Sequence, residues 1–418
     1  MKNQADIIVV GSGPAGLLAA ISASRQGARV IVLEKMDRPA LKLGITGKGR
    51  CNVTNAAPMR EFLGHTAPDQ RYLKHAFSEF FSNDIIRLLE ENGVPTIIER
   101  GERVFPESEQ ARDVVKALLK ATKASGAEII TVSSVQQLLS DENNTLTGVK
   151  LRDGSQYNAK AIIVATGGLS YPATGSSGDG YKLAQQFGHS IIQPIPALVA
   201  FETAGEMAQQ LQGLALKNVK ASIYLDGKKA GDDFGEMLFT HFGVSGPIIL
   251  TLNRRFGRAI ANGSKAFISI DLKPALDDAM LDKRLIRELD THGKMYLKSI
   301  LKELLPSAMI PVCISANELP PDIPGNQVGS DKRKKIRVWI KDLRLDITGT
   351  RDFNEAIITS GGINLKEVDA KTMKSKLVPN LFFAGEILDL EADTGGYNLQ
   401  IAYSTGWLAG LSAALLIK

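Results

Sequence analysis

Cysteine is scarce in this sequence. Its 418 residues contain only Cys51 and Cys313, which are far apart and match no CxxC or Cys/His metal-ligand spacing. This scarcity excludes a disulfide framework and a zinc site. The missing CxxC also argues against reductases that work through a dithiol. We therefore expect no bound metal.

Long hydrophobic runs are also missing. The chain reaches the apolar segment DIIVV almost at once, without the basic start and small-residue cleavage site of a signal peptide. The most apolar late run, 407–417, is shorter than the roughly 20 residues that a membrane-spanning helix needs. With 44% hydrophobic and 23% charged residues, the composition is that of a globular protein. We expect a cytoplasmic protein with no membrane partner and a buried C-terminal helix.

Neither sign of charge is in strong excess. The formal net charge is +5 and the pI is near 8.9, so most basic side chains are expected simply to solvate the surface. One local run, Lys332, Arg333, Lys334 and Lys335, is compatible with a polyanion, although a solvated linker turn is the commoner explanation. It is a weak indication of RNA binding.

The N-terminus carries a dinucleotide-binding fingerprint. A strand at 7–10 leads into GSGPAG (11–16), a helical segment and a second strand, RVIVLEK. Gly11 permits the tight turn, Gly13 lets the backbone approach a pyrophosphate, and Gly16 lets helix and strand pack closely. Glu34, at the end of the second strand, suits an adenosine ribose and disfavours a 2′-phosphate. The fingerprint alone does not separate NAD from FAD.

Three further segments complete a flavin site. The loop GITGKGRCNVTN (44–55) contains Arg50 and Asn52, which suit phosphate, ribose or flavin carbonyls, beside the thiol of Cys51. The strand AIIVATGG (161–168) ends in glycines that let its backbone run close to a cofactor. Near the C-terminus, a strand leads through an acidic turn with Asp389 to glycines that begin a helix, whose N-terminus suits the electron-rich edge of a flavin.

The chain resembles the BaiN-like family of NAD(P)/FAD-dependent oxidoreductases, also known as aminoacetone-oxidase-family FAD-binding flavoproteins. The resemblance rests on a series of motifs along nearly the whole length: GSGPAG, TGKGRCNVTN, VATGG, GSSGDGY, LFTHFGVSGP, DITGTRDFNEAIITSGGI, SKLVPNLFFAGE and TGGYNLQIAYSTG. The loop that usually reads SGGGRCN has Thr46 and Lys48 here, so Lys48 adds a charge near the expected cofactor.

Residues and resemblance together predict the cofactor contacts. They fall on Gly11, Gly13, Pro14, Ala15, Gly16, Glu34, Lys35, Arg50, Cys51, Asn52, Thr166, Gly167, Gly385, Asp389, Gly396, Asn398, Leu399 and Gln400.

The resemblance implies an α/β fold, with a Rossmann-like FAD-binding domain built from both chain ends, an inserted β-barrel-like domain and a small helical domain. We expect the FAD domain at 1–192 and 351–418, the barrel at 193–275 with a return strand at 334–350, and the helical domain at 276–333. Short alternating segments around a tight turn at Asp226 and Gly227 agree with an antiparallel barrel. The segment KKIRVWIKDLRLDITGT (334–350) is expected to be a strand.

We expect an FAD-dependent oxidoreductase. The middle of the chain holds no second strand-GxGxxG-helix unit, so NAD(P)H would dock transiently to reduce the flavin. Flavin N5 would then give hydride to an activated C=C bond. The resemblance implies either a small enone-type molecule or uridine in large-subunit ribosomal RNA as substrate. The alternatives are a flavin oxidase that acts on an amine and releases hydrogen peroxide, and a binding protein with a structural flavin.

The sequence offers three candidates for catalytic residues. His241, in LFTHFGVSGP, is a possible proton donor because the pKa of a histidine is close to neutrality, although most lone histidines are structural. Cys51 is a candidate redox centre, although a packed thiol is the commoner role. Tyr397 belongs to the polar cluster that follows the C-terminal glycines. The sequence does not predict the oligomeric state.

Overall fold

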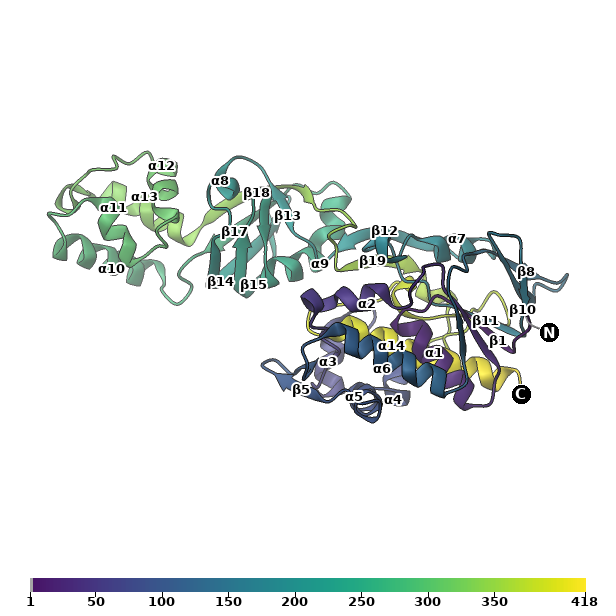
Figure 1. The fold of residues 1–418 in the computed structure, drawn as a ribbon. Helices are drawn as coiled ribbons and strands as arrows, with labels where there is room; N and C mark the ends of the chain where they lie inside the picture. Colours follow the sequence, from purple (N-terminus) through teal and green to yellow (C-terminus); the bar gives the residue numbers. More distant parts are fainter. Residues whose placement is uncertain (1–2) are drawn as a thin grey trace. The chain divides into compact units, whose positions relative to one another are not determined.

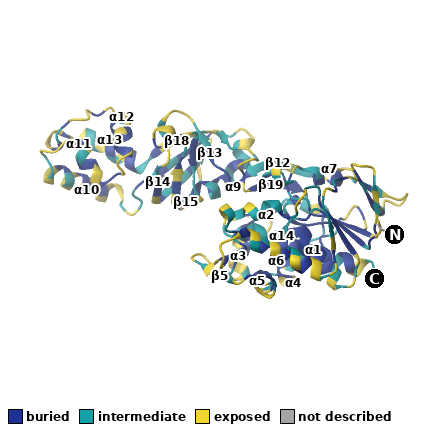
Figure 2. Cartoon of the chain, in the orientation of Figure 1, coloured by how far each residue is buried: buried dark blue, intermediate teal, exposed yellow. Residues whose placement is uncertain are grey.

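Both ends of the chain contribute to one parallel sheet (Figure 1). In the computed structural model, which describes residues 3–418, the five strands lie in the order β20-β11-β1-β2-β7, and every neighbouring pair is parallel. Strands β1, β2, β11 and β20 are apolar and buried along their whole length, whereas the edge strand β7 is partly exposed. Continuous apolar strands are typical of a parallel sheet that is covered on both faces, and Figure 2 shows the central strands in the colour of buried residues. The strands are β1 (Ile7–Val10), β2 (Val30–Leu33), β7 (Glu128–Ile130), β11 (Ala161–Val164) and β20 (Leu381–Phe383).

Helices α1 (Pro14–Arg25) and α14 (Tyr397–Leu416) pack backbone to backbone. A Cβ atom on Gly406 would lie 2.2 Å from the carbonyl oxygen of Ala15, and one on Gly410 would lie 2.1 Å from that of Ala19. Only glycine permits so close an approach. Helix α14 is long and apolar enough to cross a membrane, but 67% of its most apolar stretch is buried within the fold. The predicted buried C-terminal helix is confirmed.

Smaller elements surround this sheet. A three-stranded antiparallel sheet has the order β10-β9-β8, another has the order β3-β6-β5, and β21 pairs with β4 and β12 with β19. The bounds are β3 (Thr54–Asn55), β4 (Thr66–Ala67), β5 (Thr96–Glu99), β6 (Arg103–Pro106), β8 (Val135–Ser140), β9 (Leu146–Leu151), β10 (Gln156–Asn158), β12 (Ile191–Ala197), β19 (Ile358–Ile363), β21 (Glu391–Ala392), α2 (Leu41–Ile45), α3 (Met59–Gly64), α4 (Lys74–Glu79), α5 (Ser82–Glu91), α6 (Ala111–Ala124) and α7 (Asp179–Gln185).

The segment between these chain ends forms a closed antiparallel barrel, with four helices, α10 to α13, inserted before its last strand. The barrel order is β13-β16-β15-β14-β17-β18. The predicted hairpin turn joins β14 to β15, with Asp226 and Gly227 at φ 49° and 80°. The elements are β13 (Phe201–Thr203), α8 (Met207–Gln210), β14 (Ala215–Leu225), β15 (Lys228–Phe239), β16 (Gly243–Ser245), α9 (Pro247–Ala261), β17 (Ala266–Asp271), α10 (Asp278–Thr291), α11 (Leu297–Ile300), α12 (Met309–Ala316), α13 (Ser330–Lys341) and β18 (Leu343–Thr350).

The chain therefore forms two units, here called the two-ended unit and the inserted unit. The two-ended unit comprises the described residues up to Pro196 and Phe353–Lys418, and the inserted unit comprises Ala197–Asp352. The predicted fold class, a Rossmann-type α/β domain from both chain ends with an inserted barrel, is confirmed.

One predicted element is wrong. The segment 334–350 was expected to be a strand throughout, but its first half belongs to helix α13, and β18 starts at Leu343. Ile336, Trp339 and Ile340 are buried at helical spacing, which places one apolar face against the core of the inserted unit. The basic run also lies on this helix and not in a linker. Part of it is neutralised, because Arg333 Nε lies 2.9 Å from Asp282 Oδ1.

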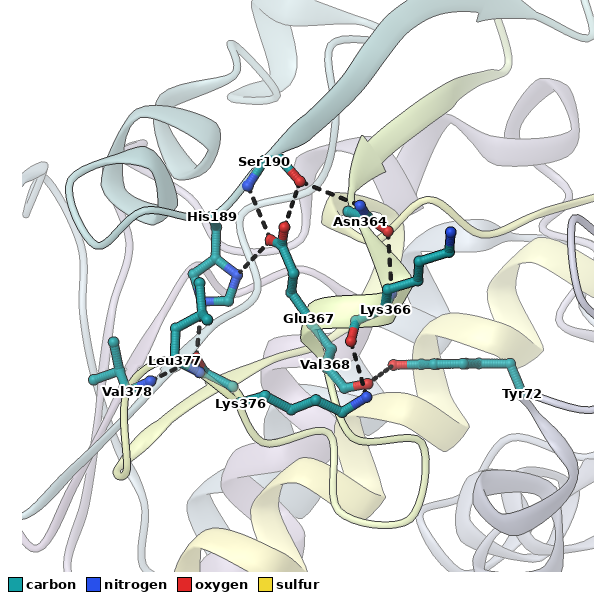
Figure 3. Close-up of polar contacts among 11 residues, drawn as sticks. Tyr72, His189, Ser190, Asn364, Lys366, Glu367, Val368, Lys376, Leu377 and Val378 are labelled. Atoms are coloured by element: carbon teal, nitrogen blue, oxygen red, sulfur yellow. Dashed lines mark hydrogen bonds and ion pairs between the residues drawn. The ribbon is translucent and has the colours of Figure 1, made fainter.

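A buried histidine ties three segments of the two-ended unit together (Figure 3). Ser375 Oγ accepts hydrogen bonds from the backbone N–H groups of Leu377 and Val378 at 3.0 and 2.9 Å. Because these bonds occupy its lone pairs, the hydroxyl donates its own proton to His189 Nε2, which lies 2.8 Å away. Nδ1 of His189 then carries the ring proton and donates to Glu367 Oε2 at 3.2 Å. This network holds His189 in its neutral form.

Acid should loosen this network. Burial lowers the pKa of His189 from its usual 6.5, against the opposing effect of Glu367. The unfolded chain therefore binds more protons than the native one below about pH 6.5, and the free energy of unfolding should fall as the pH falls through that range. Chemical denaturation between pH 7.5 and 5 should show that the free energy of unfolding falls more steeply with decreasing pH in the wild type than in His189→Gln. Equal slopes would contradict this account.

Candidate cofactor-binding site

A large cavity lies within the two-ended unit, at the carboxyl ends of its parallel strands. It holds about 1400 Å³ of empty space, part of it open to solvent. Val10, Leu33, Ala165 and Ala384, which end or follow strands β1, β2, β11 and β20, lie in its wall. Ligands of open α/β sheets bind at this edge.

Three helices begin at this cavity. The wall includes Gly13 to Ala15 at the start of α1, Asp179 at the start of α7, and Asn398 with Leu399 at the start of α14. The residues before these helices, Gly13, Gly178 and Gly396, are glycines that provide no side-chain cap. Uncapped N–H groups and the positive ends of helix dipoles favour an anion or an electron-rich ring.

The glycines of the fingerprint serve distinct purposes. Gly11 has φ +100°, and a Cβ there would lie 2.6 Å from the carbonyl oxygen of Ala165. A Cβ on Gly16 would lie 2.0 Å from the carbonyl oxygen of Gly11. A Cβ on Gly13 would meet nothing within 4 Å, although Gly13 lines the cavity. The first two glycines allow tight packing, and Gly13 leaves room where a pyrophosphate would approach.

One end of the cavity suits an adenosine. Glu34 accepts hydrogen bonds from the backbone N–H of Ser12 at 2.9 Å and from its hydroxyl at 2.6 Å, which fixes the carboxylate beside α1. Lys35 Nζ lies 2.8 Å from Asp179 Oδ2 and so joins the end of β2 to the start of α7. Burial opposes ionisation of Asp179, but hydrogen bonds from Lys35 and Ser177 lower its pKa below the usual value. The GSSGDGY motif thus forms a wall of this end.

The cavity wall also holds a charged pair that sequence reasoning missed. Lys42 Nζ lies 2.7 Å from Glu386 Oε2 and donates to Ser170 Oγ at 2.5 Å. Glu386 Oε1 accepts from the Ser170 hydroxyl at 2.6 Å and from the backbone N–H of Thr359 at 2.8 Å. Both Lys42 and Glu386 line the cavity, and each side chain is 21% exposed. Glu386 directly follows Gly385 in the FFAGE motif, which is the signal that could have found it.

The CNVTN and TGGYNLQ motifs interlock. In the amide orientation that satisfies the hydrogen bonds of the surrounding groups, the side-chain oxygen of Asn52 accepts a hydrogen bond from the backbone N–H of Gly396 at 3.1 Å. Asn55 Nδ2 donates to the carbonyl oxygen of Gly395 at 3.1 Å, and the Thr54 hydroxyl donates to Gln400 Oε1 at 2.7 Å. The first motif therefore braces the turn that begins α14.

The predicted cofactor contacts divide into two groups. Arg50, predicted to face phosphate or flavin, forms ion pairs with Glu99 at 2.5 Å and Glu109 at 2.7 Å. Asp389 does not line the cavity, whereas Glu386 does. Those that line the cavity are Gly11, Gly13, Pro14, Ala15, Glu34, Lys35, Thr166, Gly167, Asn398 and Leu399. Those that do not line it are Gly16, Arg50, Cys51, Asn52, Gly385, Asp389, Gly396 and Gln400. Direct contact of any of them with a cofactor stays a prediction.

The candidate catalytic residues lie in different places. Cys51 is fully buried, and burial raises the pKa of its thiol to about 11, so it is protonated at neutral pH. Burial likewise raises the pKa of Tyr397 to about 12, and its ring stacks on His65. His241 is exposed between β15 and β16 of the inserted unit. The catalytic roles stay predictions.

The residues of this cavity fit FAD. Among the described residues, the buried hydroxyl oxygen of Thr166 has no hydrogen-bond partner, and Thr166 lines the cavity. Glu34 and Lys35 suit the adenosine, the start of α1 suits the pyrophosphate, and Glu386 with the start of α14 suits the ribityl chain and flavin. Fold and cavity together define an FAD-binding oxidoreductase of the Rossmann class.

Comparison with known proteins identifies the family. The model of the "HI0933-like protein Rossmann domain" matches residues 5–412, and the chain belongs to this family. A 3-dehydro-bile acid delta(4,6)-reductase of Clostridium scindens is 28% identical, over 97% of this chain and 98% of its own. Ribosomal RNA dihydrouridine synthases of Escherichia coli and Haemophilus influenzae are 30% and 29% identical, over 96% and 99% of both chains.

Solved structures agree on the fold. The 3-ketosteroid-delta4-(5alpha)-dehydrogenase of Rhodococcus jostii matches with a TM-score of 0.55 and 17% identity, over 98% of this chain and 97% of its own. At this identity the likeness supports the fold alone.

Glu386 should matter for the cavity even without a cofactor. Glu386→Ala leaves Lys42 without its carboxylate in a site that is only 21% exposed. Loss of one partner of such a pair costs about 1–2 kcal/mol after allowance for partial solvation, and FAD affinity should fall about tenfold. Urea unfolding of the apoprotein and FAD titration measure the two effects. Lys116→Ala, which removes the exposed partner of the surface pair with Asp113, is the control and should change stability by less than about 0.5 kcal/mol.

Proposed function

We propose that the protein is an NAD(P)H-dependent flavoenzyme that reduces a C=C bond conjugated to a carbonyl group. The observation that carries the proposal is the FAD-fitting cavity of the two-ended unit, in a chain similar over nearly its whole length to two kinds of C=C reductase. When bound, reduced FAD supplies hydride from N5. The substrate gains that hydride and one proton, and NAD(P)H is oxidised.

The first candidate substrate is uridine in ribosomal RNA. Two relatives that span the whole chain are ribosomal RNA dihydrouridine synthases. The C5=C6 bond of uracil is conjugated to a carbonyl group, so it suits the same hydride chemistry. This substrate agrees with a cytoplasmic protein. The basic run on α13 supports RNA binding less than its sequence suggested, because Arg333 in this run is paired with Asp282.

The second candidate is a small enone, favoured by the likeness to the bile acid reductase. Purified holoenzyme with NAD(P)H should be offered uridine-containing ribosomal RNA fragments and a steroid enone in parallel. Mass spectrometry then reports which product gains two hydrogens. In addition, deletion of the gene should remove dihydrouridine from ribosomal RNA, and an unchanged dihydrouridine profile would exclude the RNA substrate.

An amine oxidase is the competing reaction class. It predicts hydrogen peroxide in proportion to amine consumed, without any need for NAD(P)H. We expect no such stoichiometry. Peroxide formed with candidate amines at the rate of flavin reduction would contradict the reductase proposal.

A further inference from the structure

A left-handed turn lies beside the cavity. Gly47, Lys48 and Gly49 have φ values of 58°, 57° and 89°. Arg50 N–H donates to the carbonyl oxygen of Gly47 at 3.2 Å, and Cys51 N–H donates to that of Thr46 at 3.1 Å. Glycine adopts these angles freely, whereas lysine carries a Cβ that makes them unfavourable. Backbone strain of this kind concentrates at functional sites.

The turn stands at the rim of the cavity. Leu43 and Thr46, which precede the turn, line the cavity, and Lys48 is exposed only two residues beyond Thr46. Lys42 and Glu386 belong to the same stretch of wall. Lys48 is therefore an exposed residue on a turn that directly follows the cavity wall.

Lys48 also differs from its basic neighbours in having no partner. The guanidinium of Arg50 is held by Glu99 and Glu109, and the ammonium of Lys42 is held by Glu386. Among residues 3–418, by contrast, no side chain or carbonyl group pairs with the Lys48 ammonium. The left-handed backbone alone is not distinctive, because exposed residues such as Glu102 and Val132 adopt it as well. The free charge of Lys48, on a turn that directly follows the cavity wall, indicates a ligand.

We propose that Lys48 binds a phosphate group of the reactant that approaches the flavin. The proposal rests on the proposed function, whose reductant, NAD(P)H, and whose first candidate substrate, RNA, both carry phosphates. A compact ammonium group suits a phosphate oxygen. A neutral enone carries no such group and should be indifferent to Lys48.

The Lys48→Gly variant is the sharpest test, because glycine suits the backbone while the charge is lost. Stability and FAD content should not fall. In anaerobic stopped-flow experiments at low salt, the NAD(P)H concentration for half-maximal flavin reduction should rise about tenfold, and its salt dependence should weaken. Lys48→Arg should retain most of the affinity. Lys120→Ala, an exposed lysine on α6, controls for charge, and Glu102→Gly, with φ +57°, controls for the backbone.

Separate arms distinguish the source of the phosphate. If Lys48→Gly loses affinity for NAD(P)H alone, Lys48 binds a phosphate group of the dinucleotide. If the variant loses affinity for RNA alone, Lys48 binds a phosphate group of the RNA. Equal affinities of the wild type and Lys48→Gly for both would overturn the proposal, as would loss of FAD from the variant.

One readout does not depend on turnover. Isothermal titration of the holoenzyme with inorganic pyrophosphate should show weaker binding in Lys48→Gly. If the wild type is reduced by no nicotinamide and acts on no RNA, the proposed function fails. The titration still decides on Lys48, because unchanged pyrophosphate binding would refute its role.

Discussion

The Gly396→Ala variant should be purified without FAD. A Cβ at this position would lie 2.3 Å from the carbonyl carbon and oxygen of Thr54, and the residue has φ +93°. The left-handed conformation costs an alanine about 1–2 kcal/mol, and the clash with a rigid backbone costs about 1–3 kcal/mol more. The turn must therefore move away from the CNVTN motif. Because this turn begins α14, the flavin end of the cavity should be lost.

Flavin absorbance per mole of purified protein measures this effect, and circular dichroism shows whether the rest of the fold persists. Gly93→Ala is the matched control, because Gly93 has a similar φ of +88° but a Cβ there would meet nothing within 4 Å. It should bind FAD like the wild type. Full FAD content in Gly396→Ala would show that the two motifs do not form the rigid junction described above.

The Gly410→Val variant should have the largest effect on stability. Its side chain would enter the contact between α14 and α1, where a Cβ alone already lies 2.1 Å from the carbonyl oxygen of Ala19. The helices must separate, and the free energy of unfolding should fall by about 3–5 kcal/mol. Urea denaturation of the apoprotein measures this value.

A moderate effect would contradict the packing account. If Gly410→Val lowers the stability by less than about 1 kcal/mol, α1 and α14 can move apart without loss. The two helices also both begin at the cofactor cavity, so the variant should lower FAD affinity although Gly410 lies outside the cavity wall.

The sequence was most informative where local geometry dictates residue type. Gly11, Gly13 and Gly16 could be assigned because a tight turn, a close ligand and a close helix each require glycine at fixed spacing. The hairpin at Asp226 and Gly227 followed from the same logic, since both residues have positive φ. Such requirements act over a few residues and are therefore visible in one sequence.

Long-range partners were not visible. Lys42 and Glu386 are separated by 344 residues along the chain and meet only because both chain ends build one sheet. The sequence likewise did not show that Glu99 and Glu109 would hold the guanidinium of Arg50, whose contact with a cofactor stays a prediction. Asn52 suits a flavin carbonyl by its chemistry, but the structure uses its amide to brace Gly396. Residue type indicated polarity, and only the fold decides the partner.

The strand expected at 334–350 failed for a related reason. Over so short a segment, the pattern of apolar and charged residues in KKIRVWIK fits both the two-residue period of a strand and the 3.6-residue period of a helix. The core of the inserted unit decides in favour of the helix, because Ile336 and Ile340 are completely buried one turn apart.

Anaerobic half-reactions test the central claim most directly. The holoenzyme should first be mixed with NADH or NADPH, and then with uridine-containing ribosomal RNA or a steroid enone. We predict that one nicotinamide bleaches the flavin, and that one of the two substrates restores its absorbance while its double bond gains two hydrogens. A flavin that neither nicotinamide reduces, or that only oxygen reoxidises with both double bonds intact, would contradict the proposed reductase.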